Sequence, residues 1–287
     1  MKISLVLGSG GARGYAHIGV IEELEARGYE IVSISGSSMG ALIGGLYCAG
    51  ALEAYKEWVL GLDVLDVAAL LDISFEKKGF IKGEKIFKKL REFVGDIRIE
   101  ELPVKFTAVA TDLKRNKEIW FQEGDLLTAI RASIAIPSFF TPLELNGMLL
   151  VDGGVLNPLP VAPGMSDHSD KIFAVNLYGN IPKVEVKIPK EIEMRQKKLE
   201  QIKEIAKKSF KKVVEEEDYS MFDIIDMSFD AMQNTLIRYR LAGYPPDLLI
   251  EIPKDVCGTY DFHKAYEVIE VGRQVAKNYL ELFHKSA

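Results

Sequence analysis

The sequence predicts an α/β protein, a three-layer α/β/α arrangement with a mostly parallel central sheet. The apolar runs Ile3 to Leu7 and Ile31 to Ser35 are typical of buried strands, and each is followed by a glycine-containing turn and a helical pattern. Two successive β-loop-α units predict parallel strands whose connecting helices cover the sheet. No linker, repeat or low-complexity tract interrupts the chain, so residues 1–287 are expected to form a single domain.

Periodicity predicts the remaining elements in chain order. Helices are expected where apolar residues recur every three or four positions, and strands where short apolar runs are bounded by turn residues. The expected helices cover 15–27, 39–49, much of 52–94, 125–135 before Pro137, 222–241 and 261–283. After the first two strands, the expected strands cover 105–111, 118–122, 149–151, 171–177 and 247–252.

The segment of about 183–218 differs from the rest of the chain in its density of Lys and Glu. Apolar residues from Ile192 to Val213 still recur in it at helical intervals. This combination predicts a charged, amphipathic helix on the surface of the domain, since a disordered linker would not keep that period.

Composition narrows the class of function and the compartment. The formal net charge of −6 argues against nucleic acid as a partner. Cys48 and Cys257 lie far apart in the chain and are expected to be reduced, buried thiols. The first residues lack the pattern of a signal peptide, and the serines and glycines in the uncharged stretch 31–52 disfavour a membrane span. A cytoplasmic protein is therefore expected, with peripheral contact at a membrane surface as a further expectation.

Residues 36–40, Gly36-Ser37-Ser38-Met39-Gly40, fit the G-x-S-x-G pattern of a nucleophile elbow. Ser38 falls on the turn between an expected strand and an expected helix. Gly36 and Gly40, two residues to either side, leave room for its hydroxyl and for a substrate. The N-terminus of the helix would stabilise negative charge near that hydroxyl. Taken alone, this pattern also suits an ordinary buried βα turn.

Two further features have the residue types of an active site. The loop from Gly8 to Gly14 is rich in glycines, whose N–H groups can converge on one oxygen. Its spacing excludes a dinucleotide fingerprint, because Arg13 stands where the third glycine is needed, and no P-loop motif occurs; a tight βα turn is the alternative. Asp152 ends an expected strand and precedes two glycines. In an α/β sheet, functional groups are presented at that position. The alternative is a turn aspartate whose carboxylate accepts a hydrogen bond from the backbone of its own turn.

Taken together, these residues resemble the patatin-like phospholipase family. Ser9-Gly10-Gly11-Ala12-Arg13-Gly14 resembles the glycine-rich oxyanion motif of the family, with a serine in place of the first glycine. Residues 36–40 resemble its nucleophile elbow, and Asp152-Gly153-Gly154 its catalytic aspartate motif. The block from Ala132 to Leu143 is similar to the family's proline-containing segment, and order and spacing agree over about residues 1–180.

The resemblance implies a patatin-like fold and a serine acyl hydrolase with a catalytic dyad, in which Ser38 is the nucleophile and Asp152 the base. It implies no metal and no cofactor. A Ser-His-Asp triad with His168 or His263 as the base is the alternative that the residues leave open. The oxyanion hole is expected from the backbone N–H groups of Gly10, Gly11, Ala12 and Arg13. The Arg13 side chain either orients this loop or meets an anionic headgroup.

The expected substrates are phospholipids or other fatty acyl esters, cleaved through an acyl-enzyme. The apolar stripes at 62–70 and 192–213 are expected to be the core-facing sides of helices, with a lid or a lipid contact as the alternative. Two other functions stay open: a soluble short-chain carboxylesterase, and a non-catalytic lipid-binding protein of the same fold. The sequence leaves the oligomeric state unassigned.

Overall fold

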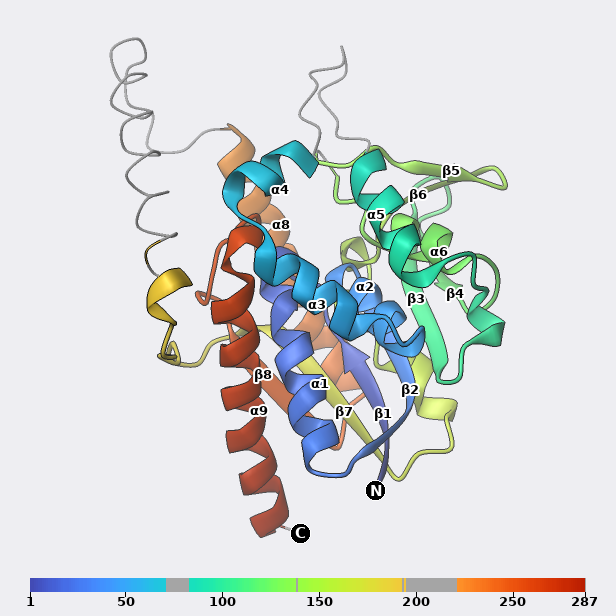
Figure 1. Cartoon of the computed structure of the whole chain (residues 1–287). Helices are drawn as coiled ribbons and strands as arrows, with labels where there is room; N and C mark the ends of the chain where they lie inside the picture. Colours follow the sequence, from blue (N-terminus) through green and yellow to red (C-terminus); the bar gives the residue numbers. More distant parts are fainter. Residues whose placement is uncertain (71–82, 138, 193, 195–220, 287) are drawn as a thin grey trace.

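A computed structural model describes residues 1–70, 83–137, 139–192, 194 and 221–286 (Figure 1). Within these residues, eight strands form one central sheet. They are β1 (Lys2–Leu7), β2 (Glu30–Ser37), β3 (Lys105–Asp112), β4 (Lys117–Phe121), β5 (Leu143–Leu145), β6 (Met148–Asp152), β7 (Lys171–Gly179) and β8 (Leu248–Pro253). Their order across the sheet is β5-β6-β3-β2-β1-β7-β8, with β4 also paired to β3.

Parallel pairing dominates this sheet. β3, β2, β1, β7 and β8 run parallel to one another, so their carboxyl ends lie along one edge. β4 and β6 run antiparallel to β3, and β5 pairs antiparallel with β6. The mostly parallel sheet predicted from the sequence is therefore confirmed. The sequence did not predict β5, because three residues are too few to show a strand's alternating pattern.

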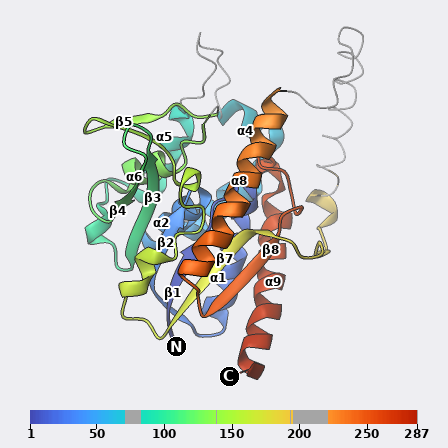
Figure 2. The same cartoon turned by 180° about the vertical axis from the view of Figure 1, so that it is seen from behind.

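Helices cover both faces of the sheet, which confirms the three-layer arrangement. They are α1 (Ala16–Ala26), α2 (Met39–Cys48), α3 (Leu52–Gly61), α4 (Val64–Leu70), α5 (Glu84–Val94), α6 (Leu126–Ser133), α8 (Met221–Gly243) and α9 (Ala265–Ser286). Figure 1 shows α1, α2, α3 and α9 on the near side of the sheet. Figure 2 shows α8 crossing the opposite face in front of β7.

The alternation of side chains along β1 explains why two apolar layers form. Leu5 and Leu7 point into the main core, which also contains apolar side chains of α1, α2 and α9. Val6 points the other way, into a smaller cluster that contains Ile237 of α8. Both faces of β1 are therefore buried, as expected for a central strand of a parallel sheet.

The charged helix predicted for 183–218 does not begin where the sequence suggested. Residues 182–189 have no regular secondary structure, and Val184 and Val186 pack against the core. Prolines at 182 and 189 contribute to this, because a proline disfavours helical conformation in the residue before it. Apart from residues 190–192 and 194, the rest of the predicted helix lies outside the described residues.

Two predictions from composition can be compared with the described residues. Cys48 and Cys257 are both free and buried, as expected. No helix in the described ranges combines the length and the apolar composition that are needed to cross a bilayer. The uncharged stretch 31–52 instead contributes β2 and α2 to the interior.

Candidate active site

The turn between β2 and α2 holds Ser38 in an unusual backbone conformation. Its φ is 56° and its ψ is −125°, a region that residues with a side chain occupy only when the surrounding structure imposes it. Strain of this kind is characteristic of a nucleophile elbow, in which the serine projects from a sharp strand-to-helix turn. Ser38 thereby lies at the carboxyl edge of the sheet and directly precedes the first residue of α2.

The elbow closes because Gly36 and Gly40 have no side chains. A Cβ atom on Gly36 would lie 2.4 Å from the carbonyl carbon of Gly40. A Cβ atom on Gly40 would lie 2.0 Å from the carbonyl oxygen of Leu7. Any larger residue at either position would force β1, β2 and α2 apart. This geometry matches the reason for which the sequence motif singled out both glycines.

Ser133 supports the elbow, and sequence reasoning missed it. Its Oγ accepts a hydrogen bond from the Ser38 backbone N–H at 2.9 Å and donates one to the Val109 carbonyl oxygen at 2.6 Å. Ser133 therefore ties the strained turn to β3. A lone serine at the end of a helix carries no recognisable pattern. Only its place within the proline-containing block of the resemblance could have drawn attention to it.

Asp152 meets Ser38 directly, although 114 positions separate them in the sequence. Ser38 Oγ donates to Asp152 Oδ2 at 2.5 Å, and the Gly154 N–H donates to Oδ1 at 2.7 Å. Both side chains are buried. Burial raises the pKa of Asp152 to about 7, while the hydrogen bonds from Ser38 and Gly154 act in the opposite direction. Near neutral pH this carboxyl group is therefore divided between its two protonation states.

The glycine-rich loop follows β1 and borders Ser38, but two of the four donors expected there are already engaged. The Ala12 N–H donates to the Thr259 carbonyl oxygen at 2.8 Å, and the Arg13 N–H donates to the Gly10 carbonyl oxygen at 3.2 Å. Each N–H has one proton to donate, so the amides of Ala12 and Arg13 are occupied within the protein in this structure. Gly10 and Gly11 both line a pocket together with Ser38. They are the remaining candidates for oxyanion donors.

The Arg13 side chain points into the protein. Its Nε donates to the Gly10 carbonyl oxygen at 3.0 Å, and its NH2 group donates to both carboxylate oxygens of Asp230 on α8, at 3.0 and 3.1 Å. The guanidinium also lies 4.5 Å from the centre of the Tyr178 ring. Of the two roles that the sequence left open, the contacts match orientation of the loop. Arg13 joins the loop to a helix more than two hundred residues later.

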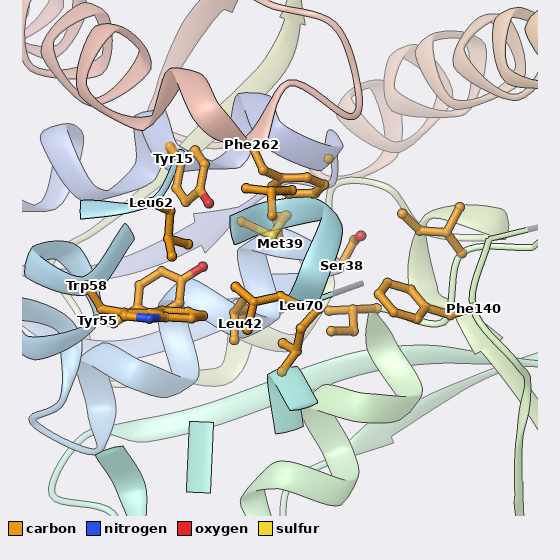
Figure 3. A pocket seen from close by; sticks show the side chains of 15 residues that line it. Tyr15, Ser38, Met39, Leu42, Tyr55, Trp58, Leu62, Leu70, Phe140 and Phe262 are labelled. Atoms are coloured by element: carbon orange, nitrogen blue, oxygen red, sulfur yellow. The ribbon is translucent and has the colours of Figure 1, made fainter. Parts of the chain in front are cut away.

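An apolar pocket extends from Ser38, with an empty volume of about 660 Å³ including its mouth. Figure 3 shows the Ser38 hydroxyl among the apolar and aromatic side chains that surround it. They include Leu42 of α2, Tyr55 and Trp58 of α3, Leu70 of α4, Phe140 and Phe262.

The apolar stripe at 62–70 has two environments. Leu62, Val67 and Leu70 line this pocket, whereas Leu65 on α4 is 69% exposed. The stripe therefore borders the pocket next to Ser38 and does not only face the core. The second stripe, at 192–213, lies outside the described residues except for residues 192 and 194.

The four histidines are the alternatives to Asp152 as the base, with His168 and His263 as the candidates from the sequence. None of them lines the apolar pocket or the smaller pocket beside Asp152. His168 is exposed and precedes β7, at the edge of the sheet opposite to Ser38. His17 is buried in α1 and its Nε2 is 2.8 Å from the Gly8 carbonyl oxygen, as expected for a packing residue.

Comparison with known proteins points to one family. The model of the patatin-like phospholipase family matches residues 5–165, which include Ser38 and Asp152. An uncharacterized NTE family protein of Mycobacterium tuberculosis is 39% identical over 98% of this chain and 92% of its own length. A lysophospholipase of Emericella nidulans is 32% identical over 61% of this chain, which corresponds to 12% of that much longer protein.

A solved structure resembles the fold at low sequence identity. VipD from Legionella pneumophila superposes with a TM-score of 0.53 and 14% identity, covering 97% of this chain and 67% of VipD. At that identity the likeness concerns the fold alone.

Proposed function

The chain belongs to the patatin-like phospholipase family, and from this premise we propose that it is a serine acyl hydrolase that cleaves carboxylic esters of lipids. The observation that carries the proposal is the 2.5 Å hydrogen bond from Ser38 Oγ to the buried carboxyl group of Asp152, at the end of an apolar pocket. A buried nucleophile beside a base of matched pKa, with room for an acyl chain, is what ester cleavage requires.

In the proposed first step, Asp152 Oδ2 accepts the proton of Ser38 while Ser38 Oγ attacks the ester carbonyl carbon. The N–H groups of Gly10 and Gly11 hold the negative charge that develops on the carbonyl oxygen. The C–O bond to the alcohol then breaks, and the alcohol leaves with the proton from Asp152. In the second step, a water molecule gives a proton to Asp152 and attacks the carbonyl carbon of the acyl-enzyme. The bond from this carbon to Ser38 Oγ then breaks, Asp152 returns the proton to Oγ, and the fatty acid leaves.

The burial of Asp152 answers the main objection to a dyad without histidine. An aspartate in water has a pKa of about 3.9 and is a weak base for a hydroxyl group. Burial raises the pKa of Asp152 to about 7, which brings it into the range where a histidine would act. Ser38 also directly precedes the N-terminus of α2, whose dipole favours negative charge on Oγ.

The apolar pocket favours substrates with a long, lipid-like acyl chain over substrates with a short one. Each methylene group that moves from water into an apolar site contributes about 0.8 kcal/mol, which is about fourfold in kcat/KM. Hydrolysis of p-nitrophenyl esters should therefore rise steeply with chain length until the pocket is full. A soluble short-chain carboxylesterase would show its best rate with acetate or butyrate esters. A non-catalytic lipid-binding protein would bind fatty acid without any turnover.

The decisive experiment compares p-nitrophenyl ester hydrolysis by the wild type, Ser38→Ala, Asp152→Asn and two control variants. Ser37→Ala is the matched control for the nucleophile, because the neighbouring Ser37 is buried and its Oγ has no hydrogen-bond partner in the described structure. His168→Ala is the control for a triad. We expect the first two variants to lose activity and both controls to keep it. Full activity of folded Ser38→Ala would refute the proposal, and loss in His168→Ala would replace the dyad by a triad.

A further inference from the structure

A second, smaller pocket also borders Ser38, and α8 forms much of its wall. Asp226, Phe229, Asp230 and Gln233 of α8 line it together with Asp152. Counted from Asp226, these four α8 residues stand at i, i+3, i+4 and i+7, so they lie on one face of the helix. The pocket has an empty volume of about 270 Å³ and is bordered by polar groups, in contrast to the apolar pocket on Ser38.

Gln233 presents an unpaired donor at this pocket. Its side chain is buried, and its Oε1 accepts hydrogen bonds from Ser9 Oγ at 2.9 Å and from the Tyr178 hydroxyl. The Ser9 bond uses the carbonyl end of the amide, and the Tyr178 hydroxyl shares its one proton between Gln233 Oε1 and Asp230 Oδ1, which is 3.0 Å away. The Nε2 end lies beside Gly154, 2.3 Å from where a Cβ atom on that glycine would be. Within the described part of the chain, Nε2 donates no hydrogen bond, so a ligand oxygen would satisfy it.

The charge of the pocket is unbalanced. Three carboxyl groups line it, those of Asp152, Asp226 and Asp230, and no Lys, Arg or His of the described chain is among its lining residues. Arg13 compensates one of them through its ion pair with Asp230. Asp226 accepts hydrogen bonds from the Tyr260 hydroxyl at 3.1 Å and from the Thr259 side chain, and the positive charge of Arg13 also acts on it. Among the described residues, three carboxyl groups thus face one guanidinium group, so an anionic group in this pocket would meet an excess of like charge.

We propose that this pocket binds the alcohol half of the ester, and that Gln233 and Asp226 select alcohols that carry no net negative charge. Gln233 Nε2 donates to a hydroxyl or ether oxygen of the alcohol, and the Asp226 carboxylate accepts from a hydroxyl group. The inference rests on the proposed ester hydrolysis and adds the identity of the leaving group. Selection against anionic alcohols arises from an unfavourable contact as much as from a favourable one.

Three substrates with the same acyl chain test the charge of the alcohol. They are 1-hexanoylglycerol, 1-hexanoyl-glycero-3-phosphate and 1-hexanoyl-glycero-3-phosphocholine, at concentrations where all three are monomeric. We expect kcat/KM for the neutral glycerol ester to exceed that for the anionic phosphate by at least about tenfold. The choline ester should recover most of that loss, because its cation cancels the phosphate charge. If the choline ester is as slow as the phosphate, the pocket rejects these alcohols because of their size and not because of their charge. The inference then fails.

Two variants of α8 assign the selectivity to a residue. Asp226→Asn should narrow the ratio of kcat/KM between the neutral and the anionic substrate by about tenfold, because it removes one of the carboxyl groups that face the alcohol. Asp223→Asn removes the same charge one turn earlier on the same helix, outside the pocket, and should leave the ratio unchanged. An unchanged ratio in Asp226→Asn, or an equal change in both variants, would overturn the inference.

The amide donor has its own test. Gln233→Met keeps the length of the side chain and removes the donor. It should therefore lower kcat/KM for 1-hexanoylglycerol more than for p-nitrophenyl hexanoate, whose leaving group has no hydroxyl group besides the esterified one. Equal losses on both substrates would remove Gln233 from the subsite. Hydrolysis of p-nitrophenyl hexanoate by the wild type also separates the two proposals. If the wild type cleaves it and the charge series is flat, only the inference fails; if it cleaves no ester, the proposed function fails as well.

Discussion

Replacing Asp152 by asparagine should abolish activity and at the same time stabilise the folded protein at alkaline pH. The folded state keeps this carboxyl group in the interior, where its pKa is raised from 3.8 to about 7, mainly by burial. A group whose pKa is higher in the folded state favours folding in its protonated form. Its ionisation therefore lowers the free energy of unfolding progressively as the pH rises through the window from about 4 to 7. Asparagine cannot ionise, so it escapes this loss.

The magnitude follows from the shift in pKa. A difference of about three units corresponds to about 4 kcal/mol at pH values well above 7, at about 1.4 kcal/mol for each unit. At pH 5, the ionisation of Asp152 has already lowered the free energy of unfolding by the equivalent of roughly one of these units. Between pH 5 and pH 8, the free energy of unfolding of Asp152→Asn should therefore rise relative to wild type by about 3 kcal/mol. Because this is a change with pH, the pH-independent effect of altering the Ser38 hydrogen bond cancels.

Urea unfolding of both proteins at pH 5, 6, 7 and 8 measures this difference directly. Asp255→Asn is the matched control, since it removes a carboxyl group from an exposed position. It should show no comparable change in the difference from wild type across the same range. A difference between Asp152→Asn and wild type that stays constant from pH 5 to pH 8 would refute the argument that Asp152 is a buried carboxyl group with a raised pKa.

Three further predictions concern the same site. The pH profile of kcat/KM should have an acid limb with a pKa of about 7, because the base must be ionised in the free enzyme; a limb near pH 4 would contradict the raised pKa of Asp152. Ser133→Ala should lower kcat by roughly tenfold or more with little change in KM. The reason is that the Ser38 N–H loses a buried hydrogen-bond partner worth about 1–3 kcal/mol. An unchanged kcat would show that the elbow keeps its conformation without Ser133. Arg13→Met should lower the free energy of unfolding by about 3 kcal/mol, because it breaks a largely buried ion pair with Asp230. Arg238 is exposed, so Arg238→Met should leave the free energy of unfolding unchanged. Thermal unfolding of both variants measures the difference.

The sequence by itself was sufficient for the features that depend on local chemistry. The parallel sheet follows from two consecutive β-loop-α units, because such units can close in few other ways. The elbow is recognisable at Ser38 because the requirement for glycine at 36 and 40 comes from a turn of only five residues. Where local signals were weak, prediction failed. β5 was too short to detect, and the proposed helix start at Lys183 ignored the prolines that flank that segment.

Tertiary structure decided everything that depends on which distant segments meet. The order of β2, β3 and β6 brings Asp152 to Ser38, and no local pattern contains that distance. Long-range contacts also engaged the amide of Ala12 and placed Gln233 beside the site. The pKa of Asp152 is the clearest case, because an isolated aspartate has the same acidity in any sequence. Its shift toward 7 arises only when the packed protein excludes water from around it.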